Sequence, residues 1–279
     1  MSSTWKRLVD GSDGGDDIKQ AIVALWDGLA GDYDSAWAHG LKTGREKRAW
    51  SDLLTRLLPL DPPLRILDVG CGTGFLSLLL AEAGHAVVGL DLSEPMLEVA
   101  RRAATDRSLP VEFVQGDAEN PTRSLGGFDA VVSRHLLWTL PSPQQGLLAW
   151  IGLLSPGGRV LAIDGFWSSK RVTDKAMAAT GRVLRRLADG RQHGDNDYEP
   201  EVAARLPLRD LTELAPVREL FTASGLVDVA TEPLTTIDRV ERSVMPVRYR
   251  LALRHRRYLV HGRLPADGPE LSKLRQAPR

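Results

Sequence analysis

The stretch that decides the fold is Ile66-Leu67-Asp68-Val69-Gly70-Cys71-Gly72-Thr73-Gly74, and Val87-Val88-Gly89-Leu90-Asp91 follows it after a short interval. The first run indicates a buried strand and a glycine-rich turn, and the second indicates another strand that ends in a carboxylate. An uninterrupted apolar run suits a parallel strand covered on both faces. Glycine lets the backbone approach a ligand where a Cβ atom would clash. The spacing therefore predicts a nucleoside-binding βαβ unit, with a helix between the two strands.

The positions of the glycines narrow the choice of nucleoside. A dinucleotide fingerprint has glycines at relative positions one, three and six. Here they fall at Gly70, Gly72 and Gly74, and Phe75 takes the place of the third glycine of that fingerprint. The spacing disfavours NAD and, with it, a nicotinamide oxidoreductase.

The same residues resemble the first motif of the class I S-adenosylmethionine-dependent methyltransferases, which is an acidic residue followed by Gly-x-Gly-x-Gly. The resemblance implies that the turn lies against the methionine part of S-adenosylmethionine and that Asp91 binds both ribose hydroxyls. Residues 111–118 resemble the family's third strand, so Asp117 is expected to accept a hydrogen bond from the adenine amine. Residues 26–34 resemble the family's entry segment, which places Tyr33 over the cofactor. The cofactor-binding residues implied in this way are Tyr33, Asp68, Gly70, Cys71, Gly72, Thr73, Gly74, Asp91, Leu92, Met96, Gly116, Asp117, Ala118, Ser133 and Arg134.

Two later segments continue the pattern. Residues 128–133 resemble the family's fourth strand, and residues 154–164 resemble its helix end, Pro-Gly-Gly turn and fifth strand. These elements follow one another at ordinary loop spacings. The resemblance implies an α/β fold, a Rossmann-like sheet of seven strands in the order 3-2-1-4-5-7-6. Strand 7 is expected to be antiparallel, and residues 227–234 and 257–263 are the expected last two strands.

The chain is expected to form one methyltransferase domain over residues 1–279. Helical spacing of apolar residues from Ile18 to Leu29 predicts an N-terminal cap helix. Residues 168–216 depart from the βα rhythm and contain a cationic amphipathic segment near 176–187, which predicts an inserted helical lid for substrate recognition. The expected parts are an N-terminal helical cap (1–60), a cofactor-binding core (61–167), the lid (168–216), and a C-terminal helix with edge strands (217–279).

Composition limits the functional classes. The single cysteine, Cys71, excludes an internal disulfide framework and a cysteine-based metal cluster. No apolar run has the length of a membrane span and no apolar block follows the N-terminus, so a cytoplasmic location without a membrane partner is expected. The formal net charge is zero, which gives no reason to expect nucleic acid. The arginine-rich run 248–257 is interpreted as a solvated helix face.

The cofactor determines what chemistry the chain has to supply. A sulfonium already activates the methyl group, so the protein must align a nucleophile, exclude water and remove a proton where the acceptor requires it. We expect no metal. Three catalytic candidates are His135, which follows the fourth strand, His39 in the cap and Tyr198 in the lid; their alternative roles are a loop pair, a helix histidine and an exposed phenol. Asp164 is a further candidate or a helix cap, and His85 is set aside because it enters the second strand, away from the ligand edge.

Aromatic residues favour a flat or apolar acceptor. Five of them lie in segments that can border the pocket: Trp26, Trp37, Trp138, Phe166 and Trp167. The expected function is methyl transfer to a small aromatic or amine-bearing acceptor of specialised metabolism, with an indole carbon as the favoured carbon acceptor. The alternatives are a quinone C-methyltransferase of the menaquinone type and a non-catalytic S-adenosylmethionine-binding protein. A homodimer is compatible with the sequence.

Overall fold

A seven-stranded sheet forms the centre of the protein. The computed structural model describes residues 15–37, 39–166, 177, 179–181, 198–252 and 256–266. The strand order is β3-β2-β1-β4-β5-β7-β6, and β7 is antiparallel to both of its neighbours while the remaining neighbours pair in parallel. The predicted fold class and strand order are confirmed. The strands are β1 (Arg65–Val69), β2 (Ala86–Asp91), β3 (Val111–Gln115), β4 (Phe128–Arg134), β5 (Leu154–Phe166), β6 (Val227–Pro233) and β7 (Arg256–Arg263).

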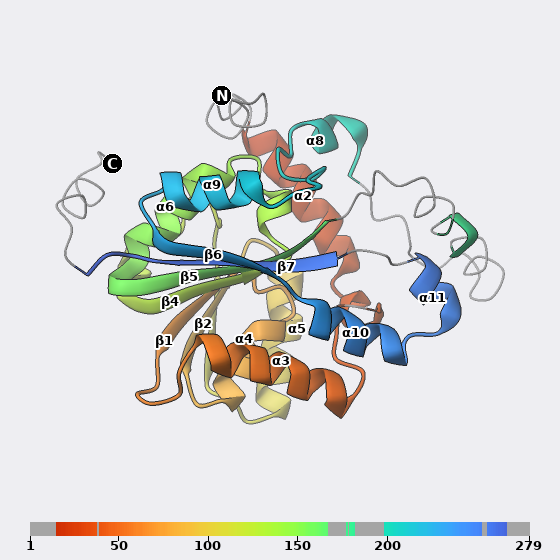
Figure 1. Cartoon of the computed structure of the whole chain (residues 1–279), viewed down its shortest axis with the longest axis horizontal. Coiled ribbons are helices and arrows are strands. Elements are labelled where there is room, and N and C mark those ends of the chain that lie inside the picture. The colour runs from red at the N-terminus through yellow and green to blue at the C-terminus, as the bar shows by residue number, and fades with distance from the viewer. Residues whose placement is uncertain are drawn as a thin grey trace.

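Helices cover both faces of the sheet (Figure 1). Leu67 and Val69 of β1 belong to a core with α6 and α9, whereas Ile66 belongs to a second core with α3, α4 and α10. This division follows from the alternation of side chains along a strand. The helices beside the sheet are α3 (Gly44–Leu57), α4 (Phe75–Glu82), α5 (Glu94–Asp106), α6 (Pro143–Leu153), α9 (Ala215–Ala223) and α10 (Thr235–Val244).

The predicted cap helix is α2 (Gly15–Leu29), which crosses the end of the sheet on the right of Figure 1. Its residues Ile18 and Ile22 pack with Tyr198 and Leu206, so the helix is joined to the segment around α8 (Pro200–Ala204). Because parallel strands end at this edge, α2 covers the edge at which open α/β sheets bind ligands. No helix in the described part of the chain is long and apolar enough to cross a lipid bilayer.

Most of the predicted lid lies outside the described residues. Within 168–216, the structure describes residues 177, 179–181 and 198–216, and the amphipathic segment expected near 176–187 falls largely beyond them. The domain boundaries therefore stay predictions.

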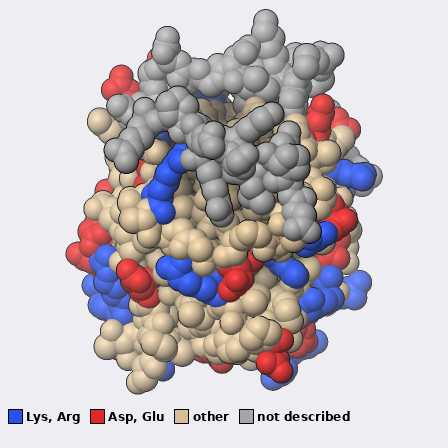
Figure 2. Space-filling view, turned by 90° about the vertical axis from the view of Figure 1, so that its left-hand side faces the viewer, with Lys and Arg blue, Asp and Glu red and all other residues tan. Residues whose placement is uncertain are grey.

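The arginine-rich run departs from its interpretation as a solvated helix face. Two helices, α10 and α11 (Val247–Ala252), connect β6 to β7, and Arg256 and Arg257 already belong to β7. Arg257 is 2% exposed. A strand places alternate side chains on opposite faces, so the neighbouring arginines differ in burial. On the face of the molecule shown in Figure 2, basic and acidic side chains are intermingled.

Candidate functional site

The glycine turn after β1 has a backbone that other residues adopt with difficulty. Gly70, Gly72 and Gly74 have φ angles of +64°, +54° and +87°, in the region that favours glycine. A Cβ atom on Gly70 would lie 2.7 Å from a methyl carbon of Leu136, whereas one on Gly72 would meet no protein atom within 4 Å. Gly70 is therefore required for packing, and Gly72 faces open space.

Asp91, at the end of β2, is tied to this turn. One carboxylate oxygen accepts from the backbone N–H of Gly72 at 2.8 Å, and the other accepts from that of Ser93 at 2.9 Å. Burial raises the pKa of Asp91 above its usual value, although these backbone hydrogen bonds oppose the shift. Each oxygen keeps a second lone pair. The carboxylate is therefore held in one orientation with the capacity to accept two more hydrogen bonds, which fits a cis-diol.

Asp117, which follows β3, lies at the other end of the same pocket. Its Oδ1 accepts from the backbone N–H of Glu119 at 2.8 Å, and its Oδ2 accepts from Lys19 Nζ at 2.6 Å. The indole N–H of Trp150 donates to the carbonyl of Ala118 at 2.7 Å, which fixes the backbone beside it. The segment is therefore rigidly placed and presents an acceptor group.

The pocket extends along the carboxyl ends of β1, β2 and β4 and is roofed by α2. Its lining is mostly apolar, with carboxylates at Asp91, Asp117 and Glu119. The open space at Gly72 and the free lone pairs of Asp91 fit S-adenosylmethionine. Of the predicted cofactor-binding and catalytic residues, those that line the pocket are Tyr33, Gly70, Gly72, Asp91, Leu92, Met96, Gly116, Asp117, Ala118, Arg134 and His135.

Comparison with known proteins agrees with this geometry. Residues 67–162 match the family model described as a methyltransferase domain. A ubiquinone biosynthesis O-methyltransferase from Shewanella halifaxensis is 30% identical over 189 residues, which cover 67% of this chain and 75% of the relative. The chain belongs to the class I S-adenosylmethionine-dependent methyltransferases. It is an enzyme that transfers the methyl group of S-adenosylmethionine, and its acceptor is a small molecule.

Two further proteins are similar to this methyltransferase. A demethylmenaquinone methyltransferase from Clavibacter sepedonicus is 37% identical over 145 residues, which cover 51% of this chain and 57% of the relative. The structure of phosphoethanolamine N-methyltransferase 2 from Haemonchus contortus in complex with S-adenosyl-L-methionine has a TM-score of 0.55 at 18% identity, and the match covers 95% of this chain and 60% of that one. The latter likeness shows the shared fold alone.

Five predicted cofactor residues are not among those that line the pocket of the methyltransferase: Asp68, Cys71, Thr73, Gly74 and Ser133. The buried carboxylate of Asp68 accepts from the backbone N–H and the hydroxyl of Ser77 at 2.9 and 2.6 Å, and burial raises its pKa to about 7. This contact holds α4 against the end of β1. Thr73 donates to Asp34 at 2.7 Å. Burial raises the pKa of the Cys71 thiol well above its ordinary value, which agrees with a small turn residue rather than a nucleophile.

His135 is a predicted catalytic residue that lines the pocket. It has a φ angle of +58° directly after β4, and its ring faces Arg257, whose Nε lies 3.4 Å from His135 Nε2. An arginine only donates hydrogen bonds. Nε2 of His135 therefore accepts, and the proton of the neutral ring lies on Nδ1. This arrangement disfavours a base role for Nε2.

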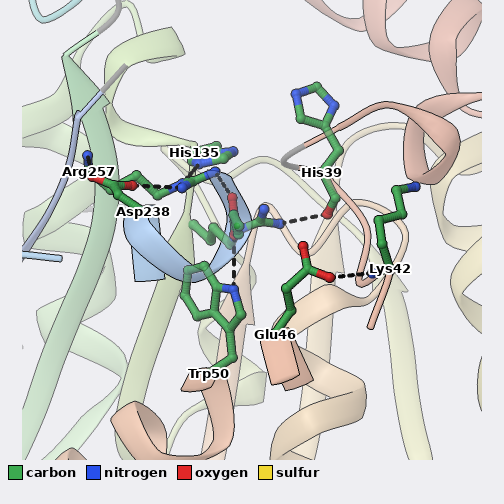
Figure 3. A network of polar contacts seen from close by, with 9 residues as sticks. His39, Lys42, Glu46, Trp50, His135, Asp238 and Arg257 are labelled. Carbon is green, nitrogen blue, oxygen red and sulfur yellow. Dashed lines mark hydrogen bonds and ion pairs between the residues drawn. The ribbon is translucent and has the colours of Figure 1, made fainter. Parts of the chain in front are cut away.

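A buried ionic network holds Arg257 in that position (Figure 3). Its guanidinium lies 2.8 Å from Asp238 and 2.7 Å from Glu241, both on α10, and Glu241 also accepts from the indole N–H of Trp50 at 3.1 Å. The network joins β7, α10 and α3 behind His135. Sequence reasoning missed it because its members come from separate elements.

His39 lies beside the pocket, behind Tyr33. The two ring centroids are 4.3 Å apart, and the His39 carbonyl accepts from Arg134 at 3.2 Å (Figure 3). Burial, together with the positive charges of Arg134, Arg257 and Lys42, lowers the pKa of His39 to about 3. Its Nδ1 is buried and has no hydrogen-bond partner among the described residues. The ring is therefore neutral at physiological pH and keeps an unused polar atom.

The remaining candidates have structural partners. The hydroxyl of Tyr198 accepts from Trp26 Nε1 at 2.9 Å and shares a hydrogen bond with Thr139, and burial raises its pKa to about 12. Asp164 is fully buried and accepts from the backbone N–H groups of Trp138 and Gly165. His85 accepts from the backbone N–H of Leu64 at 3.1 Å. These contacts explain the burial of all three without a catalytic role.

Several pocket residues escaped the sequence prediction. Lys19, Ile22 and Val23 occupy one face of α2 at the spacing of successive helical turns, beside Trp26, which the sequence placed in a segment that can border the pocket. The sequence did contain one signal for this face of the helix, because Lys19 is a charged residue at the same helical spacing as the apolar residues around it. Glu119, Thr139, Leu140 and Pro141 complete the lining, and no motif marked them. Among the described residues, no group of three or more His, Cys, Asp and Glu side chains could hold a metal ion, and metal independence stays a prediction.

Proposed function

We propose that this methyltransferase acts on an oxygen-bearing aromatic ring of the quinone-precursor type. The observation that carries the proposal is the charge distribution around His39, next to the pocket. Burial is the largest cause of its lowered pKa, and the charges that add to it are the cations Arg134, Arg257 and Lys42. Positive charge stabilises an oxyanion and opposes an ammonium. A phenolic acceptor therefore suits this end of the pocket better than an amine.

The cofactor residues are assigned within the same proposal. Asp91 accepts from both ribose hydroxyls, Asp117 accepts from the adenine amine, and the turn around Gly72 lies against the methionine part. When bound, S-adenosylmethionine supplies a methyl group activated on a sulfonium. The rings of Tyr33 and Trp26, whose centroids are 5.9 Å apart, line the cover of the pocket and help to exclude water from the transfer.

His39, which lies beside the pocket next to Tyr33, is proposed to hydrogen-bond to an acceptor that reaches past the Tyr33 ring. A pKa of about 3 makes it a weak base, but its partnerless Nδ1 is suited to a hydrogen bond with a ring hydroxyl. The same positive charges favour an oxyanion over an ammonium at this place, whereas burial opposes ionisation there, as it does for the neighbouring phenol of Tyr33, whose pKa it raises. In this proposal His39 is the hydrogen-bonding partner of the acceptor oxygen, and His135 lies on the neighbouring wall.

The named relatives support the same class of acceptor. One is a ubiquinone biosynthesis O-methyltransferase and another a demethylmenaquinone methyltransferase. Both names concern quinones, so they favour the quinone alternative that the sequence left open over an indole carbon. The methylated atom, carbon or oxygen, is to be decided by experiment.

The test uses S-adenosylmethionine with a deuterated methyl group and four probe acceptors. These are 1,4-naphthohydroquinone, 3,4-dihydroxybenzoate, indole and an aromatic amine, and the products are analysed by mass spectrometry. Label on either of the first two supports the proposal, and fragmentation shows whether carbon or oxygen carries it. Label on indole or the amine alone overturns the proposal. His39→Ala should lower turnover of the labelled acceptor at least tenfold, while its affinity for S-adenosylhomocysteine stays within about twofold of the parent.

A further inference from the structure

Lys19 of the cap helix reaches into the pocket end that holds Asp117. Its ammonium lies 2.6 Å from Asp117 Oδ2 and 2.7 Å from Glu119 Oε2. The side chain of Glu119 is 2% exposed, and its other oxygen accepts from the backbone N–H of Ser142. Lys19 and both carboxylates line the pocket. Lys19, Asp117 and Glu119 therefore form a partly buried ionic cluster and not an isolated surface ion pair.

The cluster determines how Asp117 is presented. Lys19 occupies one lone pair of Oδ2, and the backbone N–H of Glu119 occupies one of Oδ1. A carboxylate oxygen has two such positions, so each oxygen of Asp117 keeps one acceptor position. Burial opposes the charge of Lys19, but the hydrogen bonds to Asp117 and Glu119 outweigh it and raise the pKa of Lys19. The cluster therefore stays charged, and the orientation of Asp117 is fixed.

The same lysine ties α2 to the sheet edge. Ile22, Val23 and Trp26 of this helix form the rest of the roof, and Ser93 Oγ donates to Asp27 of the helix at 2.5 Å. A ligand between roof and edge contacts both only when α2 is docked. Binding and docking therefore stabilise each other.

We propose that Lys19 is a positioning residue for the cofactor: it orients Asp117 toward the adenine amine and couples docking of α2 to occupation of the adenine end. The proposal rests on the assignment of Asp117 to adenine. A charge-assisted hydrogen bond is among the stronger polar contacts in proteins, and its loss leaves Asp117 held by the backbone N–H of Glu119 alone.

The test measures binding of S-adenosylhomocysteine by calorimetry and its release by stopped-flow displacement. Lys19→Met keeps the length of the side chain without the charge, and it should weaken binding about tenfold, mostly through faster release. Lys19→Arg should restore the affinity to within about threefold of the parent. The matched control is Lys47→Met, because Lys47 pairs with Glu82 at 2.7 Å away from the pocket. Circular dichroism confirms that each variant is folded.

A double-mutant cycle with Asp117→Asn separates the possible outcomes. If Lys19 acts through Asp117, Lys19→Met has little further effect in the Asp117→Asn background. Equal effects in both backgrounds would overturn the proposal, as would unchanged affinity in Lys19→Met. Tighter binding of S-adenosylhomocysteine by Lys19→Met would also overturn the proposal, because Lys19 would then compete with adenine for Asp117. Full affinity in Asp117→Asn alone would instead refute the assignment of Asp117.

Discussion

A fall in pH should lower the free energy of unfolding through His39, because the unfolded chain takes up a proton on this ring at a higher pH than the folded protein does. The folded protein holds this ring with a pKa of about 3, compared with 6.5 for an ordinary histidine. Between these values the unfolded chain binds a proton that the folded protein does not bind. Stability rises with pH wherever the unfolded state binds more protons. The contribution of His39 is therefore complete above pH 6.5 and is lost progressively as the pH falls toward 3.

The two pKa values set the size of the effect. Each pH unit over which only the unfolded chain is protonated costs about 1.4 kcal/mol. At pH 7 an ordinary histidine is mostly neutral, so the difference between the two states is small. At pH 5 it is almost fully protonated while folded His39 is neutral. Lowering the pH from 7 to 5 should therefore cost about 2 kcal/mol through this one ring.

The assay is urea unfolding of the parent and of His39→Gln at both pH values. The variant has no titrating ring at this position, so its loss between pH 7 and pH 5 should be smaller by about 2 kcal/mol. Any cost of the substitution itself cancels in this comparison. Equal losses in the two proteins would refute the reasoning, as would an NMR titration in which the His39 ring takes up its proton near pH 6.5.

Three further substitutions test the site and its support. Asp91→Asn should weaken binding of S-adenosylhomocysteine by about 1–3 kcal/mol in calorimetry. The control is Asp129→Asn, which should leave the affinity unchanged because the Asp129 carboxylate accepts from the Arg65 backbone N–H. Equal affinities of the two variants would contradict the ribose assignment of Asp91. Arg257→Met leaves the carboxylates of Asp238 and Glu241 without their cation and should lower the free energy of unfolding by about 3–5 kcal/mol. The control Arg263→Met removes an exposed ion pair and should lower it by less than about 1 kcal/mol. Tyr198→Phe should lower stability by about 1–2 kcal/mol while turnover stays within about threefold, and a larger loss of turnover would restore Tyr198 as a catalytic residue.

Local sequence determined the cofactor half of the site. The glycine turn at 70–74 and the carboxylate of Asp91 belong to one βαβ unit, in which neighbouring parallel strands end at the same edge. Their relative placement follows from short loops and from the conformations that glycine allows. The strand order and the antiparallel β7 were predicted from the resemblance of the ordered motifs to the methyltransferase family.

Only the tertiary structure decided which residues surround the cofactor half of the site. Lys19 meets Asp117 across 98 positions of sequence, His135 meets Arg257 across 122, and Trp26 meets Tyr198 across 172. Such pairs depend on how a helix is rotated on its neighbours and on where the chain crosses the sheet, and no local periodicity encodes either. The depressed pKa of His39 has the same origin, since burial and distant arginines set it. The sequence alone therefore determined the cofactor class, and packing between distant elements decided the charge and hydrogen bonding around His39 and His135.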